Sequence, residues 1–374
     1  MGATSRILIA ADAMTTPPAR IADDTMAGSL SGASRRREPA DKIGFAHLAS
    51  QMEAVARRIA AQDGARLESM LADKAVGVDE RWRMAIAPHD DYAYAGYLYP
   101  LALRNLRAAT VVIFGVAHKA RDLGLEDRLV FDSFTHWQGP YGDIAVSPLR
   151  EKITNRMPRG SFVVDDEMQS IEHSVEAKLP FLQHRDGAFD FVPILVPCMS
   201  FSRMSELAQP LAAVLALIMN EERLDWGADL ALLSSTDAVH YGDEGWGDKD
   251  LAPYGADLRG AAEARRHDAR IMANCLDGEL SPERIERFSR STVADHDHRE
   301  YKWTWCGRYS VPFGLLVAWH LARIRGSPPL SGTILGYATS LDDQRIEVAD
   351  LDGMGVTAPA TLRHWVGYAA VGYR

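Results

Sequence analysis

The stretch MAIAPHDDYAYAGYLYP, residues 84–100, begins as a short apolar run and ends abruptly in His89, Asp90 and Asp91. An unbroken apolar run such as Met84–Ala87 is typical of a strand that is buried on both faces. Binding groups in α/β proteins lie in the loops after such strands, which carry polar side chains over a rigid scaffold. The stretch therefore predicts a buried strand with a site at its carboxyl end.

Further apolar runs alternate with amphipathic segments along the rest of the chain. This alternation favours an α/β fold, a three-layer α/β/α sandwich around a mostly parallel sheet. The other predicted strands are residues 109–116, 189–197, 228–235, 332–339 and 365–373. The predicted helices are residues 44–71, 166–183, 203–222, 257–276 and 308–324.

The N-terminal 42 residues differ in composition from the rest of the chain. They are rich in Ala, Thr, Ser, Gly and Pro and end in SRRREPADK. This composition predicts a flexible N-terminal arm over residues 1–42, with Arg35–Arg37 in a solvated turn. Neither an internal repeat nor a long linker interrupts residues 43–374, so we expect a single α/β domain there, large enough to bury a substantial core.

Charge and cysteine content exclude several classes of protein. Acidic residues outnumber basic ones 51 to 41, so no overall positive field attracts nucleic acid. The three cysteines are odd in number and far apart, unlike a secreted disulfide framework. No stretch approaches the roughly 20 apolar residues of a membrane helix. We therefore expect a cytoplasmic protein that binds neither nucleic acid nor membranes.

A histidine follows each of three predicted strands: His89, His118 and His240. A single histidine after a strand is usually only a hydrogen-bonded surface group. Three at the same end of one sheet favour a functional site, because imidazole is the commonest metal ligand and the side chain best suited to acid-base work near neutral pH.

Cys306 lies directly before a predicted helix, with Gly307 and Arg308 beside it. The helix dipole and a nearby cation lower the pKa of a thiol, and the thiolate is the form that binds metal. Cys306 is therefore a candidate ligand. Cys198 and Cys275 lie in apolar surroundings and are interpreted as core residues.

The predicted helix over residues 166–183 carries apolar and ionisable residues on adjacent faces. Asp165 or Asp166 is expected to cap its start. Glu172, His173 and Glu176 form either an ordinary solvated face or a group that orients a ligand histidine. The apolar stripe consists of Met168, Ile171, Val175, Leu179 and Leu182.

Six short motifs, in this order, resemble those of the Memo family, also called AmmeMemoRadiSam system protein B. Its fold is similar to that of class III (LigB-type) extradiol dioxygenases. The resemblance runs from about Ala85 to the C-terminus. The motifs are PHDDY (88–92), GVAH (115–118), WQGPYG (137–142), EHSVEAKLPFL (172–182), STDAVHYG (235–242) and CGR (306–308).

The resemblance implies a redox metal, iron(II) as first choice and copper as second, held by His89, His118 and Cys306. His240, Asp237 and His173 are then the catalytic candidates, with His240 as the acid-base group and Asp237 orienting it. A radical-SAM protein is the implied pathway partner. The candidates for substrate binding are Asp90, Asp91, Tyr92, Glu172 and Arg308.

Three departures from the family pattern bear on the substrate. The N-terminal family segment agxFYP is replaced by an unrelated arm, and GPSH has become GVAH. HAGY has become HDDY, which places Asp90 and Asp91 beside the first ligand. These carboxylates could hold an amine-bearing substrate, join the ligands or cap a turn. The changes together predict a specialised substrate.

These features predict a metal-dependent oxidoreductase, dioxygenase-like, that activates oxygen (O2) on a small-molecule substrate. A zinc hydrolase is an alternative, because the same ligands suit a metal that activates water. A non-catalytic binding protein and a purely structural metal site are further alternatives. The sequence leaves open which substrate and metal are used and whether the chain forms a homo-oligomer.

Overall fold

A computed structural model describes residues 35–77, 79–186 and 189–374, all within one compact unit, Ser34–Arg374. Its centre is a sheet in which five neighbouring strands run parallel. Four of these strands, all but the outer β6, are almost entirely buried, which explains their mainly apolar sequences. In sheet order they are β6 (Gly142–Val146), β8 (Asp190–Val196), β3 (Thr110–Val116), β9 (Leu230–Ser235) and β2 (Met84–Ala87).

Antiparallel strands extend the sheet beyond β2. The C-terminal strand β13 (Trp365–Tyr373) pairs with β2 and with β12 (Ser331–Thr339), and β12 pairs with β11 (Gly278–Glu279). The short strand β10 (His240–Tyr241) also pairs with β13. The expected mostly parallel sheet is therefore confirmed for the centre, and its C-terminal side is antiparallel.

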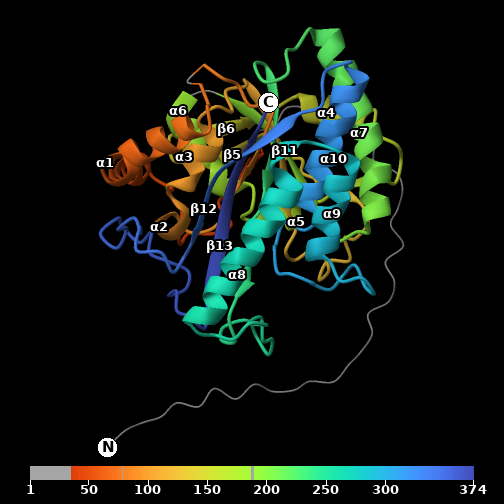
Figure 1. The fold of residues 1–374 in the computed structure, drawn as a ribbon. Helices are drawn as coiled ribbons and strands as arrows, with labels where there is room; N and C mark the ends of the chain where they lie inside the picture. Colours follow the sequence, from red (N-terminus) through yellow and green to blue (C-terminus); the bar gives the residue numbers. More distant parts are fainter. Residues whose placement is uncertain (1–34, 78, 187–188) are drawn as a thin grey trace, which may run out of the picture. The chain divides into compact units, whose positions relative to one another are not determined.

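Helices cover both faces of the sheet, as the alternation of side chains along the strands requires. In β3, Val112 and Phe114 enter one core, and Val111 and Ile113 enter the other. Figure 1 shows helices on both sides of the strands. On one side lie α1 (Ala49–Asp73), α3 (Leu98–Leu103) and α6 (Leu179–Asp186), and on the other lie α4 (Leu149–Thr154), α7 (Phe201–Glu222), α9 (Pro282–Thr292) and α10 (Ser310–Ile324). The predicted three-layer α/β/α architecture is thus confirmed.

The helices and the other strands have the following bounds. The helices are α1 (Ala49–Asp73), α2 (Tyr92–Ala95), α3 (Leu98–Leu103), α4 (Leu149–Thr154), α7 (Phe201–Glu222), α8 (Leu258–Ile271), which continues into the π-helical turn η2 (Met272–Leu276), α9 (Pro282–Thr292) and α10 (Ser310–Ile324). The remaining strands are β1 (Arg36–Arg37), β4 (Leu129–Phe131), β5 (His136–Gly139) and β7 (Phe162–Val164).

The continuous helix predicted over residues 166–183 is wrong. The chain forms α5 (Asp166–Ser170), then a turn, then η1 (Glu176–Lys178) and α6 (Leu179–Asp186). Side chains in the turn bond locally instead of leaving the backbone to a helix: Glu172 accepts the Ser174 N–H. Pro180 is tolerated because it lies in the first turn of α6. The predicted cap is present, since Asp165 accepts the Met168 N–H.

The solvated turn predicted for Arg35–Arg37 is also wrong. Strand β1 pairs in parallel with β5, with Arg37 opposite Trp137. The Arg37 side chain is only 2% exposed and forms an ion pair with Glu176. Residues 35–42 therefore belong to the packed structure, and the rest of the predicted arm, residues 1–34, lies outside the described residues.

Among the residues that the structure describes, no helix combines the length and apolar character needed to cross a membrane.

Candidate metal centre

The candidate site lies at the carboxyl ends of β2, β3 and β9. His89 and His118 each follow their strand by two residues, and Asp237 follows β9 by two. The parallel pairing of Ala87 with Ser235 places the ends of β2 and β9 side by side. The loops after three separate strands thus supply the polar groups, as expected for an open α/β sheet.

His89 is 1% exposed, and its hydrogen bonds determine which ring nitrogen carries the proton. Its Nδ1 lies 2.7 Å from Ser235 Oγ. That hydroxyl donates to the Ser174 carbonyl oxygen at 2.7 Å and accepts from the Lys178 ammonium. Because the hydroxyl has only one proton, Nδ1 of His89 must be the donor, and Nε2 carries a lone pair. Burial, together with the charge of Lys178, holds the pKa of His89 well below its usual value, so the ring is neutral.

The lone pair of His89 Nε2 faces two further potential ligand atoms. It lies 3.2 Å from Asp237 Oδ2 and 3.3 Å from Cys306 Sγ. The same sulfur accepts the backbone N–H of Asp237 at 3.0 Å. Ligand atoms of His89, Asp237 and Cys306 all lie within 4.8 Å of one another, and all three residues are buried. Imidazole, carboxylate and sulfur converging in this way form a donor set suited to a metal ion.

The environment of Cys306 corrects one sequence expectation. Helix α10 begins at Ser310, so the thiol is not at the first turn of the helix. Burial and the nearby Asp237 raise the pKa of Cys306, whereas a lowered pKa was predicted. Burial and the nearby Asp90 likewise raise the pKa of Asp237 to about 8. A bound cation would favour the deprotonated form of both groups.

His118 is oriented by a buried carboxylate. Its Nδ1 lies 3.0 Å from Glu172 Oε1, and its backbone N–H donates to Oε2 at 2.8 Å. Burial alone would raise the pKa of Glu172, but the charge of His118 and its hydrogen bonds lower it to about 2. A carboxylate that receives Nδ1–H leaves Nε2 available, which is the usual arrangement behind metal-binding histidines. Glu172 therefore supports His118, and its predicted role in contacting substrate is corrected.

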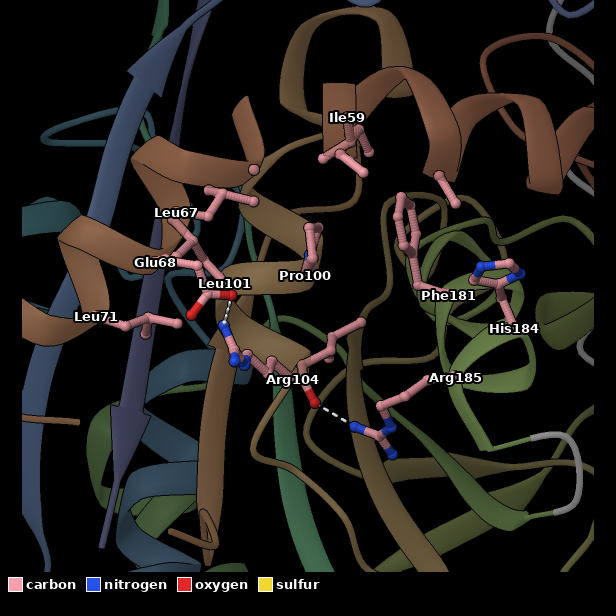
Figure 2. A pocket seen from close by; sticks show the side chains of 14 residues that line it. Ile59, Leu67, Glu68, Leu71, Pro100, Leu101, Arg104, Phe181, His184 and Arg185 are labelled. Atoms are coloured by element: carbon pink, nitrogen blue, oxygen red, sulfur yellow. Dashed lines mark hydrogen bonds and ion pairs between the residues drawn. The ribbon is translucent and has the colours of Figure 1, made fainter. Parts of the chain in front are cut away.

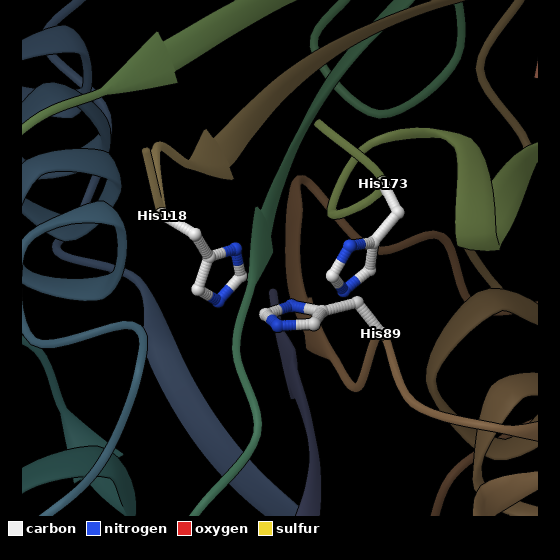
Figure 3. A group of neighbouring side chains, drawn as sticks. All are labelled: His89, His118 and His173. Carbon is white, nitrogen blue, oxygen red and sulfur yellow. The ribbon is translucent and has the colours of Figure 1, made fainter. Parts of the chain in front are cut away.

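His173 completes a second group of converging ligand atoms with His89 and His118, also within 4.8 Å of one another. The rings of His118 and His173 are stacked, with centroids 5.2 Å apart and planes 10° from parallel. Figure 3 shows the three rings converging from separate segments of the chain. His89 belongs to both groups. Of the other two predicted ligands, His118 lies in the group with His173, and Cys306 lies in the group with Asp237.

A cavity of about 270 Å³ opens above these groups. Six predicted site residues line it: His89, Asp90, His118, His173, Asp237 and His240. Nε2 of His240 is buried, and no described residue forms a hydrogen bond with it. The sequence prediction missed the other lining residues, although the glycine-rich segment after His240 contains one of them. They are Tyr94, Trp246, Ser340, Thr357, Ala358, Ala360, His364, Val366 and Tyr368.

Besides Glu172, three predicted substrate-binding residues do not line this cavity. Asp91 Oδ2 accepts hydrogen bonds from the backbone N–H and hydroxyl of Thr357, so it holds a loop. The Tyr92 ring is in the core, and its hydroxyl donates to Ala177 O. Arg308 lies over the Tyr301 ring at 3.4 Å and donates to Arg299 O. All three are corrected to structural roles.

The expected pairing of Asp237 with His240 is also corrected. The Asp237 carboxylate accepts a hydrogen bond from the backbone N–H of His89 at 3.0 Å and also contacts the His89 ring. Within the described part of the chain, no hydrogen bond joins it to His240. The His240 ring instead lies against Trp246, with centroids 5.2 Å apart. Cys198 and Cys275 are buried in the core, as predicted.

A larger cavity, about 510 Å³, lies between α1, α3 and α6, away from these groups. Its lining is mainly aliphatic, including Ile59, Leu67 and Leu101 (Figure 2). Its charged groups include the surface ion pair between Arg104 and Glu68, and no cluster of metal ligands lies there among the described residues. The smaller cavity is therefore the candidate site.

Comparisons with known proteins identify the family. The family model described as Memo-like protein matches residues 58–348. A MEMO1 family protein of Pyrococcus furiosus is 24% identical over 275 residues, 72% of this chain and 84% of the relative. MEMO1 family proteins of Saccharolobus islandicus and Methanopyrus kandleri are 30% and 29% identical over 163 residues, 42% of this chain. These two alignments span about half of the relatives' length, 52% in each case. The chain belongs to the Memo family.

Proposed function

We propose that this protein is a metal-dependent oxidoreductase that activates oxygen on a small-molecule substrate, with iron(II) as the first choice of metal and copper as the second. The observation that carries the proposal is the convergence of His89 Nε2, the Asp237 carboxylate and Cys306 Sγ within bonding reach of one ion. We retain His118 as a proposed ligand and add Asp237.

The surroundings of these donors support a metal site. Ser235 and Glu172 bind Nδ1 of His89 and His118, which leaves both Nε2 atoms to face an ion. Burial alone would lower the pKa of His118, but the charge of Glu172 raises this pKa well above its usual value, so a bound cation would displace the proton on its Nε2. Because burial raises the pKa of Asp237 and of Cys306, both groups hold a proton when no ion is bound. A cation between His89, Asp237 and Cys306 would take the place of these protons. A bound iron or copper ion would supply redox chemistry toward oxygen.

The protein's own side chains would position the substrate and move protons. Burial lowers the pKa of His240 to about 3, so its ring is neutral at pH 7. Its buried Nε2 has no hydrogen-bond partner among the described residues and can accept a hydrogen bond or a proton from a bound molecule. His173 also lines the cavity, in ring contact with His89 and His118.

Metal analysis of protein purified without oxygen tests this proposal. We expect one iron per chain in the parent protein, and oxygen consumption when the iron(II)-loaded protein is exposed to air. His89→Ala and Cys306→Ser should lose the bound iron. His320→Ala on α10, outside both ligand groups, is the matched control and should retain it. Iron bound to His89→Ala as tightly as to the parent would exclude this site.

A zinc-dependent hydrolase is the second candidate. One observation favours it: a histidine, a cysteine and a carboxylate with an adjacent open cavity also match catalytic zinc sites, which keep a position for water. The same metal analysis separates the two proposals. One zinc per chain after anaerobic purification, without iron and without oxygen consumption on iron loading, would favour the hydrolase.

A further inference from the structure

We infer that the substrate carries a protonated amine and that Asp90 is the group that recognises it. This inference rests on the proposed function, because it concerns the cavity beside the proposed metal ligands. Asp90 follows His89 directly and lines that cavity.

The hydrogen-bond partners of Asp90 in the described part of the chain are all neutral. Its Oδ2 accepts the Tyr368 hydroxyl at 2.6 Å, and its Oδ1 accepts the Asp91 N–H at 2.7 Å. Its carbonyl oxygen accepts the Tyr99 hydroxyl at 2.8 Å, which fixes the backbone as well. Across the described residues, no Lys, Arg or His forms an ion pair with it. A largely enclosed carboxylate with neutral donors alone still lacks a compensating charge.

The charges around the cavity leave Asp90 unbalanced. Among the lining residues the structure identifies, two are acidic, Asp90 and Asp237, and none is Lys or Arg. When His118 is a neutral ligand, the negative groups are Glu172, Asp237, the Cys306 thiolate and Asp90. The Lys178 ammonium, which lies behind the ligands at Ser235, and a divalent ion supply three positive charges against these four. The remaining negative charge favours a ligand with a positive charge at Asp90, which lines the cavity.

The walls of the cavity also suit an organic cation. Tyr94, Trp246 and Tyr368 contribute aromatic rings, and Trp246 is stacked on His364 with centroids 4.1 Å apart. Aromatic faces attract ammonium groups as well as apolar rings. A volume of about 270 Å³ is below the usual range for drug-sized ligands, so we infer a small molecule with one ring.

Calorimetric titration of the full chain with three matched probes tests the inference. The probes are phenethylamine, 2-phenylethanol and phenylacetate, which share a ring and differ in charge. We expect phenethylamine to bind about tenfold more tightly than the alcohol, which corresponds to about 1.4 kcal/mol, because a charge-assisted hydrogen bond is roughly twice as strong as a neutral one. Phenylacetate should bind most weakly. Equal or tighter binding of phenylacetate, or binding of none of the three, would overturn the inference.

Two variants locate the recognition at Asp90. Asp90→Asn removes the charge and should bring the affinities for the amine and the alcohol within about threefold. Tyr368→Phe removes the hydroxyl but keeps the carboxylate, and should retain the preference for the amine. An undiminished amine preference in Asp90→Asn would exclude Asp90.

Metal content, measured on the same preparations, separates this inference from the proposed function. We expect Asp90→Asn to hold as much iron as the parent. An amine preference in a parent protein that binds no metal would contradict only the proposed function. Bound metal without an amine preference would contradict only the inference.

Discussion

The hydrogen-bond partner of a histidine ring decides which nitrogen is available to a metal, and the structure shows two such partners. Ser235 holds Nδ1 of His89, and Glu172 holds Nδ1 of His118. Both partners are buried, so neither can be replaced by water without cost. At the scale of single residues, these groups control the candidate site as much as the proposed ligands do.

Replacing Glu172 by Gln should weaken metal binding without unfolding the protein. The amide keeps the shape of the side chain but loses the charge, and one acceptor oxygen becomes a donor. We expect the affinity for iron to fall by about 10–100-fold, as for other partners of metal ligands. Competition with a chelator measures it, and Glu167→Gln on α5 is the control. Unchanged affinity would show that His118 is not a ligand.

Asp268 is a second buried carboxylate with a measurable role. It accepts hydrogen bonds from the indoles of Trp303 and Trp305, at 2.7 and 2.6 Å, and from the Tyr337 hydroxyl at 2.7 Å. It thereby anchors the segment that leads to Cys306. Burial raises its pKa to about 6, although these hydrogen bonds oppose the shift.

This shift predicts a pH dependence of stability with a definite sign. The folded protein holds the Asp268 proton more tightly than the unfolded chain, whose Asp pKa is near 3.9. The resulting stabilisation is fully present below that value and is lost as the pH rises through about 6. Between pH 4.5 and 7, the free energy of unfolding should fall by about 2 kcal/mol relative to Asp268→Asn. Urea denaturation of both proteins measures this free energy. If the free energies of unfolding of the parent protein and of Asp268→Asn changed with pH by the same amount, the raised pKa of Asp268 would be contradicted.

At the scale of elements, strand β1 fastens the loop that carries Glu172 and His173. The Arg37 guanidinium donates to the carbonyl oxygens of Gln169 and Glu172, at 2.7 and 2.6 Å, and pairs with Glu176. It also lies 3.9 Å from the Trp137 ring. A planar group with five donors satisfies all these acceptors together, which a lysine cannot do. The element therefore links the start of the described chain to the site.

Replacing Arg37 by Met should destabilise the protein by about 3–5 kcal/mol, because Glu176 would remain buried without its cation. The neighbouring Arg36 is exposed and makes only surface ion pairs, so Arg36→Met should change stability by less than about 1 kcal/mol. Urea denaturation of both variants measures the contrast. Similar stabilities of the two variants would show that the contacts of Arg37 in β1 do not stabilise the loop that carries Glu172 and His173.

At the scale of the whole molecule, helix α10 can pack closely on the sheet because a glycine lies at the point of contact. Gly314, within α10, faces the sheet, where an added Cβ would lie 2.2 Å from Ser234 Oγ and 2.9 Å from the Phe114 ring. Gly64 in α1 has no atom within 4 Å of the corresponding position. Two glycines in helices thus have opposite surroundings.

Alanine at these two positions should have opposite effects. In an open position, alanine stabilises a helix by about 0.5–1 kcal/mol relative to glycine, which we expect for Gly64→Ala. For Gly314→Ala, the clash outweighs this gain, and we expect a loss of about 1–3 kcal/mol. Thermal unfolding of the two variants gives the signs. Stabilisation by Gly314→Ala would show that α10 can move away from the sheet.

The pattern of apolar runs in the sequence was sufficient to predict the α/β architecture of this protein and the positions of the histidines at its strand ends. The apolar runs at residues 84–87 and 365–373 match β2 and β13, because continuous burial of a strand leaves a direct trace in composition. The order of the short motifs indicated the Memo family, which the family match over residues 58–348 confirms. The ligand roles of His89, His118 and Cys306 stay predictions.

Only the tertiary structure decided which groups meet. Asp237 contacts His89 and not His240, Asp91 holds the Thr357 loop, and Arg37 is buried against Glu176. Each of these three contacts joins residues that are more than 100 positions apart in the chain. Hydropathy and spacing describe what one segment buries, whereas such pairings depend on strand order and register, which no single segment contains.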